Sequence, residues 1–107
     1  MRGEALRWLE QIRLHVPSSQ RGRGVEVLRD ALLETSAVDG LIAIRLLENR
    51  HIHTELSLIL EWSVSPVGPI SAPAERWLRL AGELGLAHHT FWRDVTPAAA
   101  AMEGEEP

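Results

Sequence analysis

Three ionisable residues, His15, Arg45 and Glu61, could form one polar cluster. Each lies in a run where apolar and polar residues alternate, and we expect all three on the same mixed face of a sheet. A carboxylate beside His15 could raise the pKa of the imidazole and make it a general base near neutral pH. An ion-pair network between two subunits explains the same residues, because charged groups at interfaces are commonly paired for burial alone. We favour the network.

Two tryptophans, Trp62 and Trp77, could contact a flat aromatic ligand, because indole faces offer a broad polarisable surface. Packing in the hydrophobic core is the simpler explanation, particularly for Trp77, whose neighbours follow helical spacing. The sequence leaves both roles open.

The histidines His51 and His53 are two residues apart, and His88 and His89 are adjacent. Imidazoles on one face of a strand can chelate a metal ion. No carboxylate stands at a typical ligand spacing, so we predict no metal site. The nucleophile, phosphate-loop, dinucleotide and zinc-protease motifs are also absent from the sequence.

The amino-acid composition excludes several classes of protein. The 107 residues suit a single domain, and 45% of them are hydrophobic. There is no cysteine, so disulfides and thiolate chemistry are excluded. The eleven basic residues are all arginine, are spread along the chain and are outnumbered by fifteen acids, which argues against a nucleic-acid partner. No apolar stretch of ~20 residues and no signal-peptide pattern is present, so we predict no membrane association and a cytoplasmic location.

The first half of the chain predicts a strand, a helix and a hairpin. Residues 11–16 alternate as a strand, whereas the preceding residues 5–10 fit either a strand or a helical turn. A helix should follow, capped by Ser18 or Ser19 and reaching Thr35. Residues 41–48 and 54–62 read as a hairpin. We expect Leu46 opposite Leu56, Ile44 opposite Leu58 and Ile42 opposite Leu60 on its apolar face.

The second half predicts a connector, a helix and a closing strand. Residues 63–73 hold three prolines and a glycine and suit an irregular connector. Ser71 is a candidate cap for a helix that Gly85 ends, with Pro73 in its first turn. Residues 88–95 alternate as a last strand, and residues 97–107 form an acidic tail expected to be flexible.

The order β-α-β-β-α-β predicts an α+β, ferredoxin-like domain over residues 1–96, with a four-stranded antiparallel sheet and two helices on one face. Strand one should lie between strands three and four. The other sheet face would carry several apolar residues, namely Leu41, Ala43, Leu47, Ile59 and Trp92. A face this apolar is rarely left in water, so we expect a second copy to cover it in a homodimer.

Four segments resemble the antibiotic biosynthesis monooxygenase-like family, whose members are dimeric α+β barrels. They are IRLHVPSSQRGRGVEVLRDAL at 12–32, DGLIAIRLLE at 39–48, LILEW at 58–62 and HHTFWRDV at 88–95. The Glu61-Trp62 ending is the most specific of these marks. The chain departs from the family where residues 63–73 replace a helical segment that often carries a histidine. It also lacks the first-strand asparagine of haem-degrading relatives.

The resemblance implies a function. Active members oxidise electron-rich aromatic or quinol substrates, often without metal or flavin, in a pocket between the sheet and the helices. In this chain that pocket would be lined by Trp62, Trp77, His89 and Phe91. We therefore expect a cofactor-independent monooxygenase that binds a small aromatic or quinol ligand. The alternative is a non-catalytic dimeric module of the same fold that binds a small ligand or supports a partner.

Overall fold

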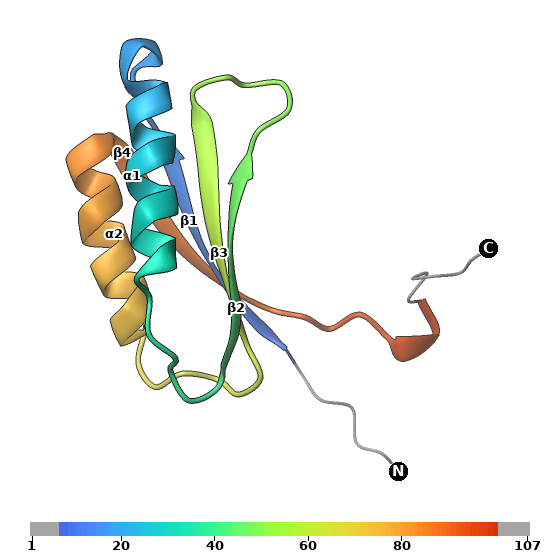
Figure 1. Cartoon of the computed structure of the whole chain (residues 1–107). Coiled ribbons are helices and arrows are strands. Elements are labelled where there is room, and N and C mark those ends of the chain that lie inside the picture. Colours follow the sequence, from blue (N-terminus) through green and yellow to red (C-terminus); the bar gives the residue numbers. More distant parts are fainter. Residues whose placement is uncertain (1–6, 101–107) are drawn as a thin grey trace.

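The computed structural model describes residues 7–100 and has two layers, a four-stranded antiparallel sheet and two helices on one of its faces (Figure 1). The strands are β1 (Trp8–His15), β2 (Leu41–Glu48), β3 (Glu55–Trp62) and β4 (Leu86–Arg93). The helices are α1 (Arg21–Leu33) and α2 (Ala72–Leu84), and two short 3-10 turns span Ser18–Gln20 and Ala98–Ala100. The sheet order is β2-β3-β1-β4, which confirms the ferredoxin-like prediction and places β1 between β3 and β4.

The central strand β1 starts earlier than predicted, at Trp8, because both of its neighbours extend that far. Trp8 lies opposite Trp62 of β3 and opposite Arg93 of β4. The choice left open for residues 5–10 is therefore settled as strand from Trp8 onward, while residues 5 and 6 lie outside the described part of the chain. The same pairing places β4 at residues 86–93, two residues closer to the N-terminus than the predicted range of 88–95.

The β2–β3 hairpin has the predicted pairing of strands in a different register. Leu46 lies opposite Leu58, and Ile44 lies opposite Leu60, so the register is shifted by two residues. A shift of two keeps every side chain on its face, because side chains alternate with a period of two. The apolar face is therefore as predicted between residues 44 and 48.

A bulge at the start of β2 reverses the sheet faces that were predicted for Leu41 and Ile42. The register shifts between Leu41 and Ala43, so that Leu41 lies opposite Trp62 on the helix-facing side. An extra residue in one strand reverses the alternation before it. Leu41 thus packs against the core instead of lying on the open face, and Ile42 is exposed instead of buried.

The two helices start differently. Helix α1 has no side-chain cap: Ser18 and Ser19 lie in the preceding 3-10 turn, and the cap position is Gln20, which makes no capping hydrogen bond. The Ser71 hydroxyl caps α2 as predicted by accepting a hydrogen bond from Ala74 N at 3.0 Å. Helix α2 contributes most of the helix-layer core, with Pro73, Ala74, Trp77 and Ala81 buried.

Gly85 ends α2 where the chain passes close to the end of β1. A Cβ atom at this position would lie 2.1 Å from the His15 carbonyl oxygen. Only glycine, which has no Cβ, permits this close approach. β4 then pairs with β1 from its first residue, Leu86, which lies opposite His15.

Candidate active site

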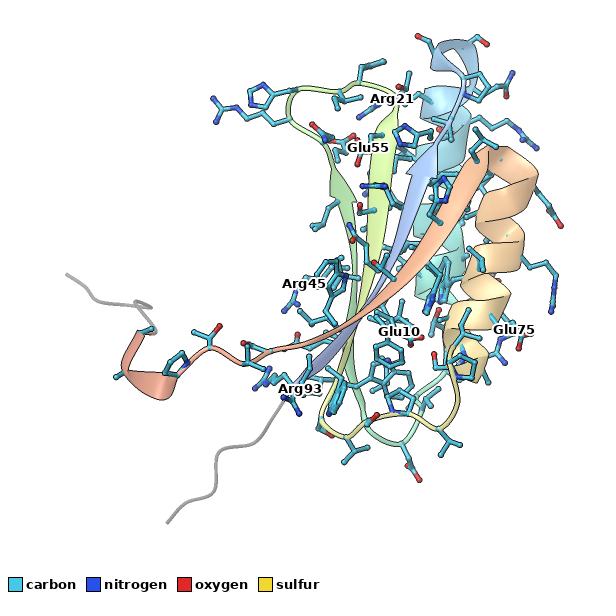
Figure 2. All side chains as sticks on the ribbon, turned by 180° about the vertical axis from the view of Figure 1, so that it is seen from behind. Glu10, Arg21, Arg45, Glu55, Glu75 and Arg93 are labelled. Carbon is cyan, nitrogen blue, oxygen red and sulfur yellow. The ribbon has the colours of Figure 1, made fainter. Side chains whose placement is uncertain are left out.

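The carboxylate of Glu10 is completely buried, with 0% of the residue exposed, on the helix-facing side of β1. A buried charge requires partners, and Glu10 has three residues that supply them. Oε1 accepts hydrogen bonds from Trp62 Nε1 at 2.9 Å and from the Ser71 hydroxyl. Oε2 accepts one from the Ser71 backbone N–H at 2.9 Å and lies 2.8 Å from His89 Nε2. Figure 2 shows Glu10 close to the first turn of α2.

The four contacts decide the ionisation of Glu10. Burial by itself raises the pKa of the carboxyl. The hydrogen bonds from Ser71, His89 and Trp62 oppose burial and together hold the pKa below its usual 4.5. Glu10 is therefore ionised at neutral pH.

An ionised Glu10 also fixes the tautomer of His89. A carboxylate only accepts hydrogen bonds, so His89 Nε2 must carry the proton that Oε2 receives. In the neutral imidazole, Nδ1 then holds the free lone pair. No hydrogen bond to Nδ1 is formed within residues 7–100, and this arrangement is the one a general base needs.

Four elements converge to build this group. Glu10 and Ile12 share one face of β1, and Ile12 lies opposite His89 of β4, so the two polar residues are diagonal neighbours across the strands. Trp62 is the last residue of β3, and Ser71 is the cap of α2. The serine hydroxyl donates to Glu10 while it accepts from the helix, which ties the start of α2 to the sheet.

Aromatic residues continue this site towards the edge of the sheet. Phe91 meets both His89 and Trp8 edge to face, with ring centroids 6.0 and 6.1 Å apart. The Arg93 guanidinium lies 5.8 Å from the Trp8 ring centre. The His89 side chain is 14% exposed, and Trp8 and Phe91 are half-buried. This aromatic edge, formed by Trp8, His89 and Phe91, is the part of the site that reaches the surface.

The four predicted pocket residues fall into two places. His89 and Phe91 belong to the aromatic edge, and Trp62 shares the Glu10 carboxylate with His89 but is only 3% exposed. Trp77 is 7% exposed and borders a hollow between the end of α1 and α2. The lining of that hollow contains neither Glu10 nor His89, so the four residues do not surround one cavity there.

The predicted polar cluster is formed only in part. Arg45 Nη1 donates to Glu61 Oε1 at 2.9 Å, and Arg7 binds the other carboxylate oxygen. Hydrogen bonding to Arg45 is the main cause that lowers the pKa of Glu61. His15 lies opposite Glu55, whereas Glu61 lies opposite Leu9, which leaves six residues of β1 and ~20 Å between them. Glu61 is therefore not the partner of His15, and the open face carries ion pairs from Arg7 and Arg45 to Glu61 within one chain.

The histidine pairs do not converge on a metal ion. His51 and His53 are exposed in the turn between β2 and β3, and His88 and His89 point to opposite faces of β4. Within residues 7–100, no three histidine, cysteine or acidic side chains are grouped as metal ligands. No helix in the same range is long and apolar enough to cross a membrane.

Glu10 and Trp8 were not among the predicted site residues. The signal was present, because Trp8, Glu10 and Ile12 are spaced by two and would place an acidic residue on an otherwise apolar strand face. Extending the first strand by three residues would have exposed this conflict. A charge on a core-facing position is informative because it requires specific partners.

Comparisons with known proteins establish the fold. No family model and no curated protein matches the sequence. Among solved structures, a protein named Rv0793 from Mycobacterium tuberculosis is 20% identical, with a TM-score of 0.60 over 86% of this chain and 98% of that one. A candidate antibiotic biosynthesis monooxygenase from Bordetella bronchiseptica is 15% identical, with a TM-score of 0.57 over 88% and 99% of the two chains. A conserved protein from Methanosarcina mazei is 11% identical, with a TM-score of 0.61 over 82% and 92%. The chain thus has the fold of antibiotic biosynthesis monooxygenase-like proteins.

Proposed function

We propose that this chain is a homodimeric, cofactor-independent monooxygenase of a small aromatic or quinol substrate, with His89 as its general base. The observation that carries the proposal is the buried Glu10 carboxylate, which holds His89 through Nε2 and leaves Nδ1 free to take a proton. The sequence resemblance motivates the reaction class, and the similar structures support the framework alone. The substrate ring would rest on Trp8 and Phe91.

The reaction balances with dioxygen as the only oxidant. With a substrate of the anthrone type, His89 Nδ1 takes a proton from a ring methylene made acidic by two flanking aryl groups that are conjugated with a carbonyl across the ring. The resulting carbanion gives up electrons to O₂ and forms a C–O bond, and the peroxide oxygen takes the proton back to give a hydroperoxide. Loss of water then breaks the O–O bond and the remaining C–H bond and leaves a carbonyl. The substrate supplies all four electrons: one oxygen atom enters the product and the other leaves as water.

A histidine pair in the chain allows a sharp test. Anthrone, whose central methylene has the required acidity, is incubated with the protein in air and under argon, and anthraquinone is measured. His89→Gln keeps an N–H for Glu10 but has no basic nitrogen, so the rate should fall about a hundredfold, the usual contribution of a general base. His88→Gln, one residue away on the opposite face, should keep the rate. Equal product in air and under argon, or equal rates for wild type and His89→Gln, would end the proposal.

The dimer part of the proposal rests on the open sheet face. Trp92 is 56% exposed there and Leu47 is also exposed. The Arg45 side chain, which pairs with Glu61, lies away from both helices (Figure 2). Burying such a face against a second copy removes large apolar side chains from water. Sedimentation at micromolar concentration should give twice the chain mass, and Trp92→Arg should shift the protein to a monomer. A stable wild-type monomer would contradict this part.

The non-catalytic module stays a second candidate, because Trp62 and Trp77 are both packed in the core. A filled core between sheet and helices suits a binding or scaffold protein that has no large reaction chamber. Such a module would bind anthrone or a quinol with no turnover in air. The activity measurement above, combined with a binding titration of the same compounds, separates the two candidates.

A further inference from the structure

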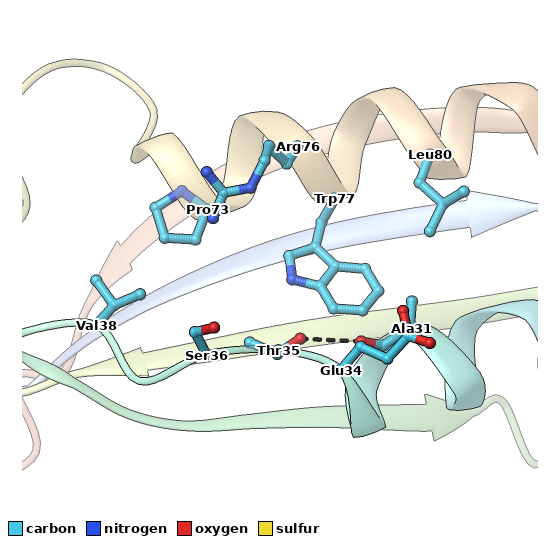
Figure 3. A pocket seen from close by; sticks show the side chains of 9 residues that line it. All are labelled: Ala31, Glu34, Thr35, Ser36, Val38, Pro73, Arg76, Trp77 and Leu80. Carbon is cyan, nitrogen blue, oxygen red and sulfur yellow. Dashed lines mark hydrogen bonds between the residues drawn. The ribbon is translucent and has the colours of Figure 1, made fainter.

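A hollow of about 310 Å³ separates the end of α1 and residues 34–38 from α2 (Figure 3). Its lining is mixed. Pro73 and Trp77 are buried and Val38 and Leu80 are half-buried, whereas the polar residues Glu34, Thr35, Ser36 and Arg76 are exposed. Small-molecule sites begin at roughly 300 Å³, so this volume suits a ligand with a single ring. The Trp77 indole hangs from α2 into the space between the walls (Figure 3).

Two opposite charges stand apart at this hollow. The Arg76 side chain extends along α2 towards Pro73, whereas Glu34 lies beside Ala31 beyond the Trp77 ring (Figure 3). Within residues 7–100 the two form no ion pair with each other. Arg76 and Glu34 therefore provide a cation and an acceptor on opposite sides of the Trp77 ring (Figure 3). Thr35 also lines the hollow, and its hydroxyl donates a hydrogen bond to the Ala31 carbonyl oxygen at 3.1 Å.

We infer that this hollow is a binding site for a single-ring aromatic acid that carries an amino group at the opposite end of the ring. The ligand's carboxylate would pair with Arg76, its amino group would donate to Glu34, and its ring would lie against Trp77 and Leu80. A ligand in this place does not touch Glu10 or His89. The inference is therefore independent of the proposed oxygenase reaction.

The test measures binding of three probes to the full chain by calorimetry: 4-aminobenzoate, benzoate without the amino group, and aniline without the carboxylate. Each charged contact at a solvent-facing rim contributes up to about fivefold in affinity. We expect 4-aminobenzoate to bind about fivefold more tightly than benzoate or aniline. Arg76→Gln should abolish the tighter binding of 4-aminobenzoate relative to aniline. Glu34→Gln should abolish its tighter binding relative to benzoate.

Two control variants keep the outcome clear. Arg79→Gln removes an exposed arginine of α2 that is not part of the lining, and it should leave all three affinities unchanged. His89→Gln should also leave them unchanged, since loss of binding there would place the probe at the aromatic edge. The inference is overturned if the three probes bind with equal affinity. It is also overturned if neither Arg76→Gln nor Glu34→Gln changes the affinity for 4-aminobenzoate, or if His89→Gln lowers that affinity.

Discussion

Glu10→Gln is the sharpest test of the site, because it changes the charge and hydrogen bonding of the buried group with almost no change of shape. The carboxylate accepts from four donors, two at each oxygen. A glutamine amide has one oxygen and one NH₂ group. If the NH₂ replaces Oε1, it faces the Trp62 indole N–H, and if it replaces Oε2, it faces the Ser71 backbone N–H. Either orientation leaves a buried donor without an acceptor.

The magnitude follows from this count. One buried unsatisfied donor costs about 1–3 kcal/mol, and the remaining bonds lose the strength that the negative charge gave them. We expect Glu10→Gln to lower the free energy of unfolding by about 2–4 kcal/mol at pH 7, a large part of the ~5–15 kcal/mol typical of a domain. The melting temperature should fall by about 10–20 °C.

Urea unfolding followed by circular dichroism measures the loss, with Glu26→Gln as the matched control. Glu26 is an exposed carboxylate on α1, and its substitution should change stability by less than about 0.5 kcal/mol. The pKa of Glu10 is lowered in the folded state, so its contribution is present above the unfolded value near 4.5 and is lost as pH falls through the folded pKa. The difference between wild type and Glu10→Gln should therefore shrink in acid. A difference below 0.5 kcal/mol at pH 7 would refute the assignment of an ionised acceptor.

Four further substitutions test other parts of the structure by the same unfolding measurement. Ser71→Ala removes both the helix cap and a donor to the buried carboxylate and should cost about 2 kcal/mol; a loss under 0.5 kcal/mol would show that the cap is dispensable. Gly85→Ala should cost more than about 3 kcal/mol, since its Cβ would meet the His15 carbonyl, whereas Gly82→Ala, with open space around it, should gain up to about 1 kcal/mol; similar effects would contradict the close approach. Glu61→Gln should cost about 1 kcal/mol at pH 7 and less as pH falls below 4.5, because its folded pKa is lowered; a pH-independent cost would argue against the ion pairs.

Periodicity alone predicted which elements exist and in what order. Alternation in 41–48 and 54–62, helical spacing in 74–84 and the cap at Ser71 are local properties, and the structure confirms them. The side of the sheet on which most residues lie is also local, because it depends only on alternation. His89 and Phe91 were therefore correctly placed on the helix-facing side.

Tertiary contacts determined the strand register, the bulge and the extent of β1, which the alternation of residues does not specify. The bulge that turns Leu41 inward and Ile42 outward depends on how β2 pairs with β3, and the two-residue register shift is equally compatible with the apolar pattern. The pairing of β1 with both neighbours carried the strand back to Trp8 and so brought Glu10 into the core. Four donors from separate segments meet there only after the sheet and α2 have packed together. The sequence thus determined the order of the elements and the faces of the strands. The three-dimensional packing determined which charged residue is buried. A carboxylate is stable inside a protein only when other parts of the chain supply its hydrogen bonds, and here those parts are distant in sequence.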